Sequence, residues 1–542
     1  MTNLSKSKYT TYWQCPKMLW LDVYKHSEKA EPDMSTKMRL EAGTKVGKLA
    51  HQLFPNVVDA TVTDANGNPD TAAMIARTQQ LMANSSNSPR INPRSNSFNS
   101  PNSPLVIAEA AFSFNGCYCA VDLLVQTPGG WDIHEVKSSS FPEQDGSPSE
   151  LKKYAPDIAY QKWVLTQCGV NVTGTHLVCL NADYVRHGAL DIQQLFVIID
   201  MQNVGIKKPV DLIADEYLKV PINVAKAQKM LADSRTEPNE DLDRHCEKPY
   251  PCLFWDYCSR HLPSPSVFDV YGGSFTSKGD DRFYLDKKLE HYRAGRVSYD
   301  DLVDQPLGII QRMQVERQTH IDAGAIRSFL NTLRYPLYFL DFETMQFAVP
   351  EYDDSKPYQQ ISFQYSLHIV KDPNTLCNKK GWGYLAPSDG NDPRRKLAED
   401  LCAHIPMGAC TVVYNDTFEK SRLKEMAEIY PDLHDHLLSI RDGICDLLVP
   451  FREGHYYLPA MGGSFSIKSV LPALFPSDPD LDYHNLAGSV HNGGEAMTIF
   501  PQIKDMPSVE AKAARDSLLE YCNLDTWAMV KLWQKLMEII NG

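Results

Sequence analysis

The later half of the chain places acidic side chains at three points where divalent cations could be held. Asp341 and Glu343 close the apolar run PLYFLDFET, and residues two apart on a strand project from one face. Glu419 follows the strand-like run CTVVY at the start of a helical pattern. Tyr521 and Asp525 lie four apart, so they share one face of a helix. A D-x-E pair alone is weak evidence, but four carboxylates in this order can bind the two cations that phosphodiester hydrolysis uses.

The earlier half carries a second set with a lysine. Asp122 ends the apolar run CYCAVD, and Glu135 and Lys137 share a face of the strand-like DIHEVKSSS. His51 in VGKLAHQLF could add a ligand, and Gln161 in AYQKW could orient the cluster. Carboxylates hold hard cations, while a lysine positions the attacking water and neutralises phosphate charge. An isolated Glu-x-Lys pair is usually a solvated ion pair, so the interpretation depends on the whole ordered set.

Four cysteines form a third pattern. Cys246, Cys252 and Cys258 recur at equal spacing in RHCEKPYPCLFWDYC, and Cys15 lies early in WQCPKMLWL. Regularly spaced thiols suit a soft metal centre. Zinc is the first competitor, although structural zinc sites usually have closer C-x2-4-C pairs. Buried structural cysteines are the remaining alternative.

Elements of both types must position these residues. The hydrophobic patterns predict helices and strands mixed in both halves, so the fold class is α/β or α+β throughout. The expected helices are 6–24, 35–54, 149–168 (with Gly169 as its stop) and 508–540, and the expected strands are 106–114, 119–126, 131–137, 175–181 and 336–342. The segment GHYYLPAMGGSFSIKSVLPALFP could contact a nucleotide base or serve as a packing loop, and the sequence leaves both open.

Length and composition set the domain organisation. A chain of 542 residues with 43% hydrophobic and 23% charged residues is long enough for two to four folded domains, and it excludes disordered, collagen-like and coiled-coil classes. The Ser/Asn/Pro-rich stretch 84–104 is expected to be a disordered insertion. A composition change near residue 262 predicts a first domain at 1–262, a linker or bridging helical segment at 263–330 and a second domain at 331–542.

Charge and cysteine usage indicate the compartment. The chain lacks a long apolar run, and its start carries three lysines without an apolar segment, so neither export nor membrane insertion is indicated. Thirteen cysteines in a chain of this length do not form a disulfide framework, which favours a reducing cytoplasm. The net charge of −14 argues against indiscriminate polyanion binding, although residues 1–50 are locally basic, a weak pointer to phosphates.

The earlier set resembles the PD-(D/E)XK nuclease superfamily, in particular its RecB-like branch. The resemblance implies a restriction-endonuclease-like fold in which His51, Asp122 and Glu135 bind Mg²⁺ or Mn²⁺, Lys137 is catalytic and Gln161 supports the cluster. Leu165 stands where that family often has a tyrosine. RecB-like nucleases with an iron–sulfur clamp, including CRISPR-associated ones, also place one cysteine before the nuclease core and three after it. The likeness implies a [4Fe–4S] cluster on the four cysteines that stabilises the domain by joining its two ends.

The later set resembles the DnaQ-like, or DEDD, exonucleases on an RNase H-like fold. By this resemblance Asp341, Glu343, Glu419 and Asp525 are metal ligands and Tyr521 orients the attacking water. Glu419 replaces the usual aspartate, and the neighbouring Asp416 could compete for its role.

Together the halves resemble bacterial fusions of an iron–sulfur RecB-like nuclease with a DnaQ-like domain formerly of unknown function. The resemblance implies a cytoplasmic, metal-dependent nuclease with two active sites that acts on DNA, from single strands or ends, in repair, mobile-element or phage-defence settings. Opposite polarities of the two sites rest on family analogy alone. Two alternatives stay open: a nucleic-acid-binding scaffold with one or both sites inert, and an RNA exonuclease.

Overall fold

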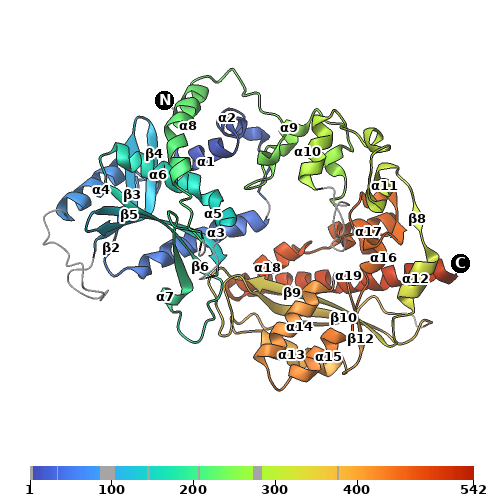
Figure 1. Ribbon diagram of the computed structural model, residues 1–542. Helices are drawn as coiled ribbons and strands as arrows, with labels where there is room; N and C mark the ends of the chain where they lie inside the picture. The colour runs from blue at the N-terminus through green and yellow to red at the C-terminus, as the bar shows by residue number, and fades with distance from the viewer. Residues whose placement is uncertain are drawn as a thin grey trace. The chain divides into compact units, whose positions relative to one another are not determined.

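The computed structural model describes residues 4–32, 34–85, 104–142, 147–205, 208–272, 284–374 and 377–541. Within these ranges the chain is a mixed α/β protein that divides into two compact units (Figure 1). The first unit comprises Met1–Arg260 and Phe347–Tyr358, and the second comprises His261–Gln346 and Gln359–Gly542. Most of the expected insertion 84–104 lies outside the described residues; its first two residues end a helix.

A seven-stranded sheet forms the centre of the first unit. Its path runs β2-β3-β4-β5-β6-β7, with the short β1 beside β4. Strands β3, β4 and β5 form an antiparallel meander, and β6 returns parallel to β5 after a helix, because a parallel neighbour needs a crossover connection. The strands are Leu4–Ser5 (β1), Val57–Asp59 (β2), Val106–Phe114 (β3), Cys117–Thr127 (β4), Gly130–Phe141 (β5), Val172–Asn181 (β6) and Phe196–Asp200 (β7).

Helices cover both faces of this sheet. Apolar residues of α1, α6 and α8 join one core cluster, whereas α3 and the segment Phe347–Tyr358 contribute to the other. The helices are Lys6–Gln14 (α1), Pro16–Tyr24 (α2), Met34–Ala50 (α3), Thr71–Ser85 (α4), Pro148–Leu151 (α5), Ala155–Gln167 (α6), Ile192–Leu195 (α7), Ala214–Leu231 (α8) and Trp255–Ser259 (α9).

Local sequence explains the turns that set the register of this sheet. Asn115 and Gly116 join β3 to β4 with φ of 46° and 75°, and Asn-Gly is the pair that two-residue hairpin loops favour. Gly169 ends α6 with a φ of 81°, which matches the predicted stop. These turns hold β4, β5 and α6 in the register that brings the acidic residues of the first unit together.

The second unit contains a five-stranded sheet in the order β11-β10-β9-β12-β13. Strand β9 is central, with β10 antiparallel on one side and β12 parallel on the other. A separate pair is formed by β14 and β8. The strands are His320–Ile321 (β8), Leu337–Gln346 (β9), Gln360–Val370 (β10), Trp382–Leu385 (β11), Cys410–Val413 (β12), Ile444–Asp446 (β13) and Tyr456–Tyr457 (β14).

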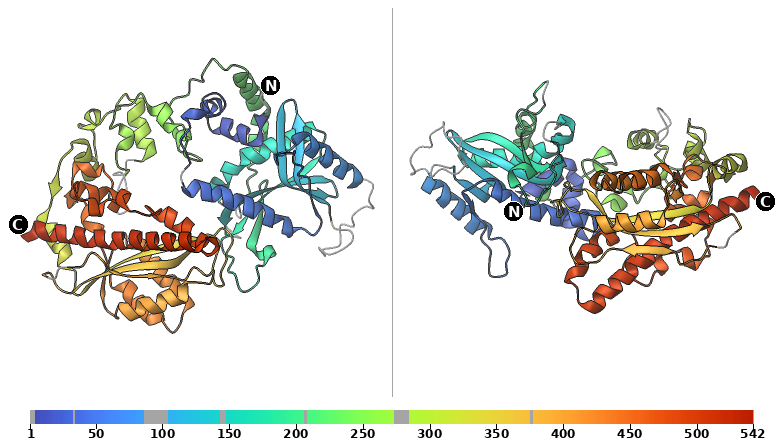
Figure 2. Two further views of the ribbon diagram at one scale, coloured as in Figure 1. Left: turned by 180° about the vertical axis from the view of Figure 1, so that it is seen from behind. Right: turned by 90° about the horizontal axis from the view of Figure 1, so that it is seen from below.

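The faces of this sheet carry different helices. Helices α13, α14 and α15 pack against Tyr338, Leu340 and Phe342 of β9, while the long α19 lies along the opposite face (Figure 2). Phe339 contacts Trp533 of α19, with ring centroids 6.2 Å apart, so the odd-numbered residues of β9 face α19. The helices are Leu285–Arg293 (α10), Ile309–Val315 (α11), Ala323–Leu330 (α12), Arg394–His404 (α13), Thr417–Ile429 (α14), His434–Asp442 (α15), Val449–Arg452 (α16), Ile467–Leu474 (α17), Gly493–Gln502 (α18) and Ser508–Asn541 (α19).

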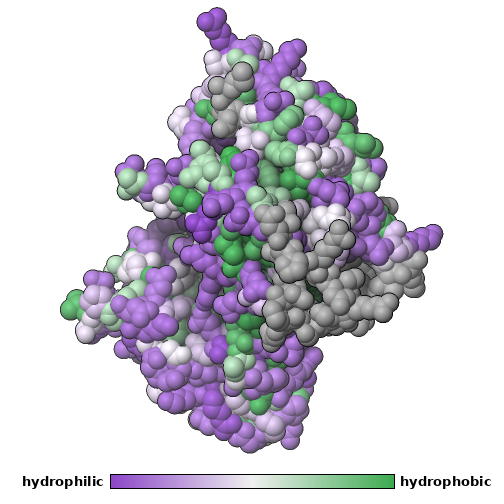
Figure 3. Space-filling view, turned by 90° about the vertical axis from the view of Figure 1, so that its left-hand side faces the viewer, coloured by the Kyte–Doolittle hydropathy of each residue, from purple (hydrophilic) through white to green (hydrophobic). Residues whose placement is uncertain are grey.

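The segment 263–330, expected to be a linker, contributes helices α10 to α12 to the second unit where it is described. Among the described helices, none is both long and apolar enough to cross a membrane. The described residues on the face drawn in Figure 3 are mostly hydrophilic, with apolar residues in small patches.

Candidate functional site

Strand β9 presents two carboxylates at the end of its apolar run. Pairing with β12 covers only Leu337 to Phe339, so Asp341 and Glu343 extend past that neighbour. On the other side they lie opposite Ser366 and Gln364 of β10. Both carboxylates belong to the face that α19 covers, because they alternate with the residues that pack against α13 to α15.

Two helices add the remaining predicted residues. Strand β12 ends at Val413, Asn415 takes a φ of 73°, and α14 then begins with the buried Glu419 in its first turn. Tyr521 and Asp525 lie buried on α19. The carboxylates of Asp341, Glu343 and Glu419 act on one another electrostatically, as do those of Asp341, Glu343 and Asp525. The structure therefore brings the five predicted residues of this set together.

Buried polar contacts fix α19 against β10. Gln364 donates a 2.7 Å hydrogen bond to the carbonyl of Leu518, and the hydroxyl of Ser366 donates a 2.5 Å hydrogen bond to the carbonyl of Cys522. The hydroxyls of Ser366 and Thr526 are 2.7 Å apart. Polar groups on the buried face of a strand are costly unless they are paired, so these bonds specify the position of α19 relative to the carboxylates of β9.

The carboxylate cluster is electrostatically strained. Burial, together with the neighbouring acids, raises the pKa of Asp341 and Glu343 well above their usual range. Burial also raises the pKa of Asp525 to about 6 and that of Glu419 to about 8. One carboxylate oxygen of Glu419 is buried without a hydrogen-bond partner. Buried acids that repel one another are stabilised by a cation, so this donor set fits divalent metal ions with oxygen ligands.

Three residues near this cluster were not predicted from the sequence: Tyr483, Lys468 and Cys522. Tyr483 donates a 2.6 Å hydrogen bond to Asp525 Oδ1, and Lys468 lowers the pKa of Glu343 and Asp525 by its charge. Ligand atoms of Asp341, Glu343 and Cys522 all lie within 4.8 Å of one another, which makes this the one metal-competent group of three among the described residues.

The competing Asp416 has a different partner. Its carboxylate forms an ion pair with Lys420 one turn along α14. Glu419, by contrast, is 2% exposed and acts on Asp341 and Glu343. The geometry therefore favours Glu419 over Asp416 as the member of the cluster from this junction.

The segment 454–476, which the sequence assigns either to base contact or to packing, lines a pocket in the second unit. Residues 464–467 form part of a cavity of about 410 Å³ together with Tyr271, Tyr414, Asn415, Leu448 and Arg452. The ring of Phe465 packs edge-on against Tyr271, with centroids 5.0 Å apart, and its carbonyl accepts a 2.6 Å hydrogen bond from Tyr414. The segment thus both packs in the second unit and lines a cavity.

In the first unit, β4 and β5 bring Asp122, Glu135 and Lys137 together. Lys137 Nζ lies 2.6 Å from Glu135 Oε1, and the amide of Val136 donates a 2.7 Å hydrogen bond to Asp122 Oδ2. Gln161 donates a 2.7 Å hydrogen bond to Glu135 Oε2 from α6. These contacts agree with the predicted grouping of all four side chains around Glu135.

Lys6 was not found from the sequence, although it lies at the centre of this group. Its Nζ is 3.0 Å and 3.1 Å from the two oxygens of Glu135 and 3.4 Å from Asp122 Oδ1. Strand β1 positions it, because Leu4 pairs with Cys117 and its carbonyl accepts a hydrogen bond from Tyr160. An ammonium therefore holds the position between the two carboxylates that the resemblance assigns to a metal ion.

Asp157 on α6 completes the buried network. It accepts a 2.8 Å hydrogen bond from Lys137 and a 3.1 Å bond from Gln161. Burial and the charge of Glu135 raise the pKa of Asp122 to about 7. Burial alone would also raise the pKa of Glu135, but the two lysines outweigh it and lower that pKa well below its usual range. Charges of both signs thus compensate in this site.

His51 is not brought into such a group. It begins a 3₁₀ turn, His51–Leu53, directly after α3, and its side chain is half-buried. Within the described parts of the chain, His51 does not share a metal-competent group with Asp122 and Glu135. Leu165, at the family's tyrosine position, is fully buried in the core. The assignment of His51 as a ligand remains a prediction.

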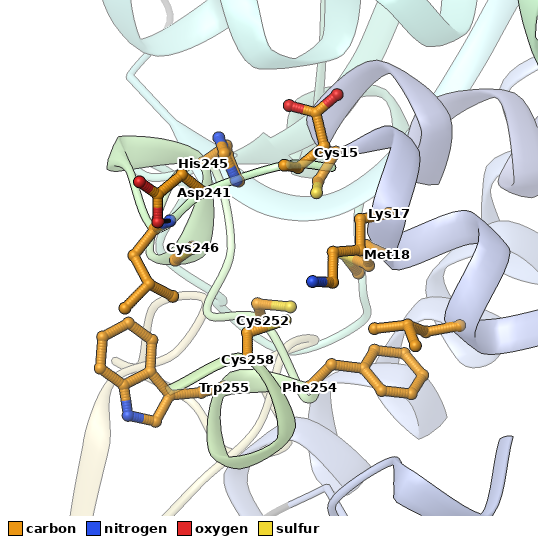
Figure 4. A pocket seen from close by; sticks show the side chains of 13 residues that line it. Cys15, Lys17, Met18, Asp241, His245, Cys246, Cys252, Phe254, Trp255 and Cys258 are labelled. Carbon is orange, nitrogen blue, oxygen red and sulfur yellow. Dashed lines mark hydrogen bonds between the residues drawn. The ribbon is translucent and has the colours of Figure 1, made fainter. Parts of the chain in front are cut away.

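The four predicted cysteines line one cavity in the first unit. Pro16 cannot continue α1 and instead begins α2, so Cys15 lies at the break between them with extended backbone angles. Cys246, Cys252 and Cys258 come from the segment that follows α8 (Figure 4). The amide of Cys252 donates a 2.8 Å hydrogen bond to the carbonyl of Cys246, which closes this segment into a loop.

The four thiols form no disulfide and influence one another. Burial raises the pKa of Cys15 to about 12 and that of Cys246 to about 11, and the neighbouring sulfurs add to both shifts. Tetrahedral zinc, with Zn–S of about 2.3 Å, would hold the sulfurs about 3.8 Å apart. All four cysteines lie in described ranges, and no three of their sulfurs lie within 4.8 Å of one another. Four thiols that line one cavity form a donor set that fits a soft metal centre.

Comparisons with known proteins place only part of the chain. Residues 338–466 match a family model described as a domain of unknown function, DUF2779. The chain is 31% identical over 176 residues to the uncharacterized protein UU173 of Ureaplasma parvum, which covers 31% of this chain and 25% of that protein. It is 24% identical over 228 residues to the uncharacterized protein MG366 of Mycoplasma genitalium, which covers 39% of this chain and 33% of that protein. The chain thus spans about a quarter to a third of these relatives, and no solved structure matches it.

Proposed function

We propose that this protein is a metal-dependent nuclease with two active sites that hydrolyses phosphodiester bonds in DNA, from single strands or ends. One observation carries the proposal: Asp341, Glu343, Glu419 and Asp525 come from three remote parts of the chain and meet beside Tyr521, with all but the half-buried Asp341 buried. Such a concentration of buried negative charge is costly without a function, and its donors are those that Mg²⁺ and Mn²⁺ prefer.

In the second unit the residues divide the work of hydrolysis. The four carboxylates hold the cations, which supply an activated water and neutralise charge on the scissile phosphate. Tyr521 lies one turn before Asp525 and orients the water through its hydroxyl. Tyr483 donates a hydrogen bond to Oδ1 of Asp525 and so fixes the orientation of that carboxylate. Lys468 is positioned to neutralise phosphate charge near the tyrosine rings, 5.2 Å and 5.5 Å from their centroids.

In the first unit Asp122 and Glu135 hold the cation and Lys137 positions the water and the phosphate. Gln161 and Asp157 orient these groups, since both contact Lys137 or Glu135 directly. Lys6 must leave its place between Asp122 and Glu135 before a cation can bind there. Displacement by metal and phosphate together is reasonable, because the lysine can then pair with the substrate.

The four cysteines would hold a [4Fe–4S] cluster, because they line one cavity and thiolates are the usual ligands of such clusters. This role is structural in the proposal. Cys15 lies in the first helices and the other three near residue 250, so a shared cluster joins two ends of the unit and removes the entropy of a long open loop.

The strand orders support the folds that the resemblances imply. In the first unit an antiparallel meander is followed by a helix and a parallel strand, with the acidic residues on the meander. In the second unit the central β9 has an antiparallel and a parallel neighbour and carries two of the carboxylates just past its pairing with β12. These arrangements support a RecB-like and a DnaQ-like assignment, respectively.

The test is digestion of end-labelled oligonucleotides by anaerobically purified protein. With Mg²⁺ or Mn²⁺ we expect single-stranded DNA to be shortened, and with EDTA we expect it to remain intact. Labels at the 5′ and 3′ ends in separate reactions give the polarity, and matched RNA oligomers identify the sugar preference. Intact DNA and intact RNA under every metal condition would overturn the proposal.

A second candidate function has one observation in its favour. Lys6 neutralises the carboxylates of the first unit in the absence of metal, which is also what an inert, binding-only site would require. In that case the first unit binds nucleic acid without cleaving it. Retained binding with no loss of activity in Lys137→Ala would support this reading for the first unit.

A further inference from the structure

The first unit contains a large cleft that neither predicted site accounts for. It has a volume of about 830 Å³. This volume is in the range that takes a ligand of drug-like size, so it suits a few nucleotides of one strand rather than a duplex. Its lining comes from three remote segments: Trp13 and Gln14, 139–153 in part, and 244–249 in part.

The charge of this cleft is opposite to that of the protein. Among the described residues that line it, the cationic ones are Lys152, Lys153, Arg244 and Lys248, and the one carboxylate is Glu150. The whole chain carries a net charge of −14, so four cations facing one cleft stand out. Positive charge concentrated in a concave surface attracts phosphates and raises their local concentration.

Aromatic and hydroxyl groups complete the lining. Trp13 borders the cleft, and its indole nitrogen donates a 3.1 Å hydrogen bond to the buried Glu216, which fixes the ring. Ser139, Ser140 and Ser149 add hydroxyls that can bond phosphate or sugar oxygens. A basic groove with an aromatic side chain for base stacking is the usual composition of sites for single-stranded nucleic acid.

The cleft adjoins the predicted active site of the first unit. Ser139 lies two residues beyond Lys137 on β5, and its hydroxyl is 2.7 Å from that of Tyr154. The charge of Lys137 acts on Tyr154 and on Tyr250, which is next to the cleft residue Pro249. A strand in the cleft would therefore lead to Glu135 and Lys137.

The wall at 244–249 is also tied to the cysteine cavity. His245 lines both cavities, and Cys246 follows it directly. Gln14, the neighbour of Cys15, donates hydrogen bonds of 2.8 Å and 2.7 Å to the carbonyls of His245 and Tyr250. A metal centre that joined Cys15 to Cys246 would therefore also hold together the two walls of the cleft that Gln14 and His245 line.

We infer that this cleft binds a single strand of nucleic acid and delivers it to the active site of the first unit. The inference takes the reaction at that active site from the proposed function, but what it claims is that the cleft binds a strand. It assigns phosphate contacts to Lys152, Lys153, Arg244 and Lys248 and base stacking to Trp13.

The test measures binding of a fluorescein-labelled oligothymidylate to the cluster-containing protein in EDTA, at several salt concentrations. In Arg244→Ala/Lys248→Ala and in Lys152→Ala/Lys153→Ala we expect at least tenfold weaker binding. Single strands give a salt slope of about −0.7 per phosphate contact, so loss of two contacts should reduce it by about 1.4. The charge-matched control is Lys226→Ala/Lys229→Ala on the exposed side of α8, which should bind as the wild type.

A second variant separates stacking from folding. Trp13→Ala should weaken binding with an unchanged salt slope, and Trp13→Phe should restore most of it. Circular dichroism and thermal unfolding show whether each variant is folded. Wild-type affinity in both double variants, equal losses in the α8 control, or no binding by the wild type would each overturn the inference. Strand binding that depends on the cleft without any cleavage would instead contradict the nuclease proposal alone.

Discussion

At the scale of single residues, the two predicted centres handle charge differently. In the second unit, four carboxylates repel one another and Lys468 is the cation that acts on Glu343 and Asp525. In the first unit, Lys6 and Lys137 neutralise the carboxylates at hydrogen-bond distance. A metal ion therefore relieves repulsion in one centre and replaces an ammonium in the other, and the two should respond differently to substitution.

Asp341→Asn should stabilise the metal-free protein while it removes activity of the second unit. The buried acids have raised pKa values, about 6 for Asp525 and about 8 for Glu419, so the folded state binds protons more tightly than the unfolded state. The free energy of unfolding should therefore fall as the pH rises from about 4 to about 8, and removal of one charge should make this fall shallower.

The measurement is thermal unfolding in EDTA at pH 5.5, 7 and 8.5. We expect a Tm increase of a few degrees at pH 8.5, which corresponds to about 1 kcal/mol in a unit of this size, and a smaller increase at pH 5.5. Asp435→Asn, at an exposed position in the first turn of α15, is the control and should give no gain. A lower Tm for Asp341→Asn at all three values would contradict the repulsion argument.

Lys6→Gln should tighten metal binding in the first unit. The variant removes the ammonium that competes for Asp122 and Glu135. We expect the apparent Kd for Mn²⁺ to fall by about tenfold, the effect of about 1.4 kcal/mol. Calorimetric titration is carried out in the Asp341→Asn background, which weakens the site of the second unit, and Lys226→Gln in the same background is the control. Weaker Mn²⁺ binding in Lys6→Gln would mean that the lysine supports the site instead of competing for it.

The predicted residues and the missed ones differ in a physical way. Asp122 and Asp341 follow apolar runs, and Glu135 and Lys137 lie two apart in a strand-like segment, so these local patterns are visible in the sequence. Lys6 is separated from Asp122 by 116 positions, and Tyr483 from Asp525 by 42, so their contacts arise from tertiary packing. A single lysine or a single tyrosine carries no periodic pattern, so the sequence could not have identified Lys6 or Tyr483 as site residues.

At the scale of elements, the contact between β10 and α19 positions the carboxylates of the second unit. Ser366→Ala should leave the buried carbonyl of Cys522 without its side-chain partner and remove one contact of the Thr526 hydroxyl, which also lies 2.8 Å from His368 Nδ1. Unpaired buried groups cost about 1–3 kcal/mol, so we expect a lower Tm and a lower kcat with little change in KM. Ser328→Ala on α12, whose hydroxyl bonds only within its own helix, is the control. An unchanged kcat would show that α19 is positioned by apolar packing alone.

The second element-scale prediction concerns the cysteine cavity. Cys246→Ser should lose bound iron and sulfide and loosen the segment that carries Arg244 and Lys248, because the proposed cluster joins that segment to α2. Proteolysis should then cut near residue 250 faster than in the wild type. Cys168→Ser replaces an exposed cysteine outside the cavity and should retain iron. Iron-free wild-type protein from an anaerobic preparation would remove the cluster assignment and leave both carboxylate centres in place.

Element boundaries were predicted where a local signal exists. Gly169 ends α6 as expected, and the long C-terminal helix runs over Ser508–Asn541 against the expected 508–540. The break between α1 and α2 within the expected 6–24 follows from Pro16. Strand β5, by contrast, continues to Phe141, beyond the expected residue 137, because Ser140 and Phe141 pair with β6. Pairing with a strand that is remote in the sequence can lengthen an element, and the local sequence of that element does not predict the extension.

At the scale of the whole molecule, the chain separates into two units close to the predicted boundary. The unexpected part is Phe347–Tyr358, which follows the carboxylate strand of the second unit and yet belongs to the first. There the hydroxyl of Tyr358 bonds to the carbonyl of Ser138, and Arg186 bonds to the carbonyl of Pro350. The composition of Phe347–Tyr358 does not predict this placement, because nothing in these residues indicates whether they pack in the first or the second unit.

The central claim is that both units cleave DNA through their own acidic residues, and the rates of single and double variants test it most directly. In Mg²⁺ or Mn²⁺, Asp341→Asn and Lys137→Ala should each lose the activity of one unit, by at least a hundredfold for that site, and keep that of the other. The double variant should leave end-labelled single-stranded DNA intact. Cleavage by the double variant at the wild-type rate would contradict the account.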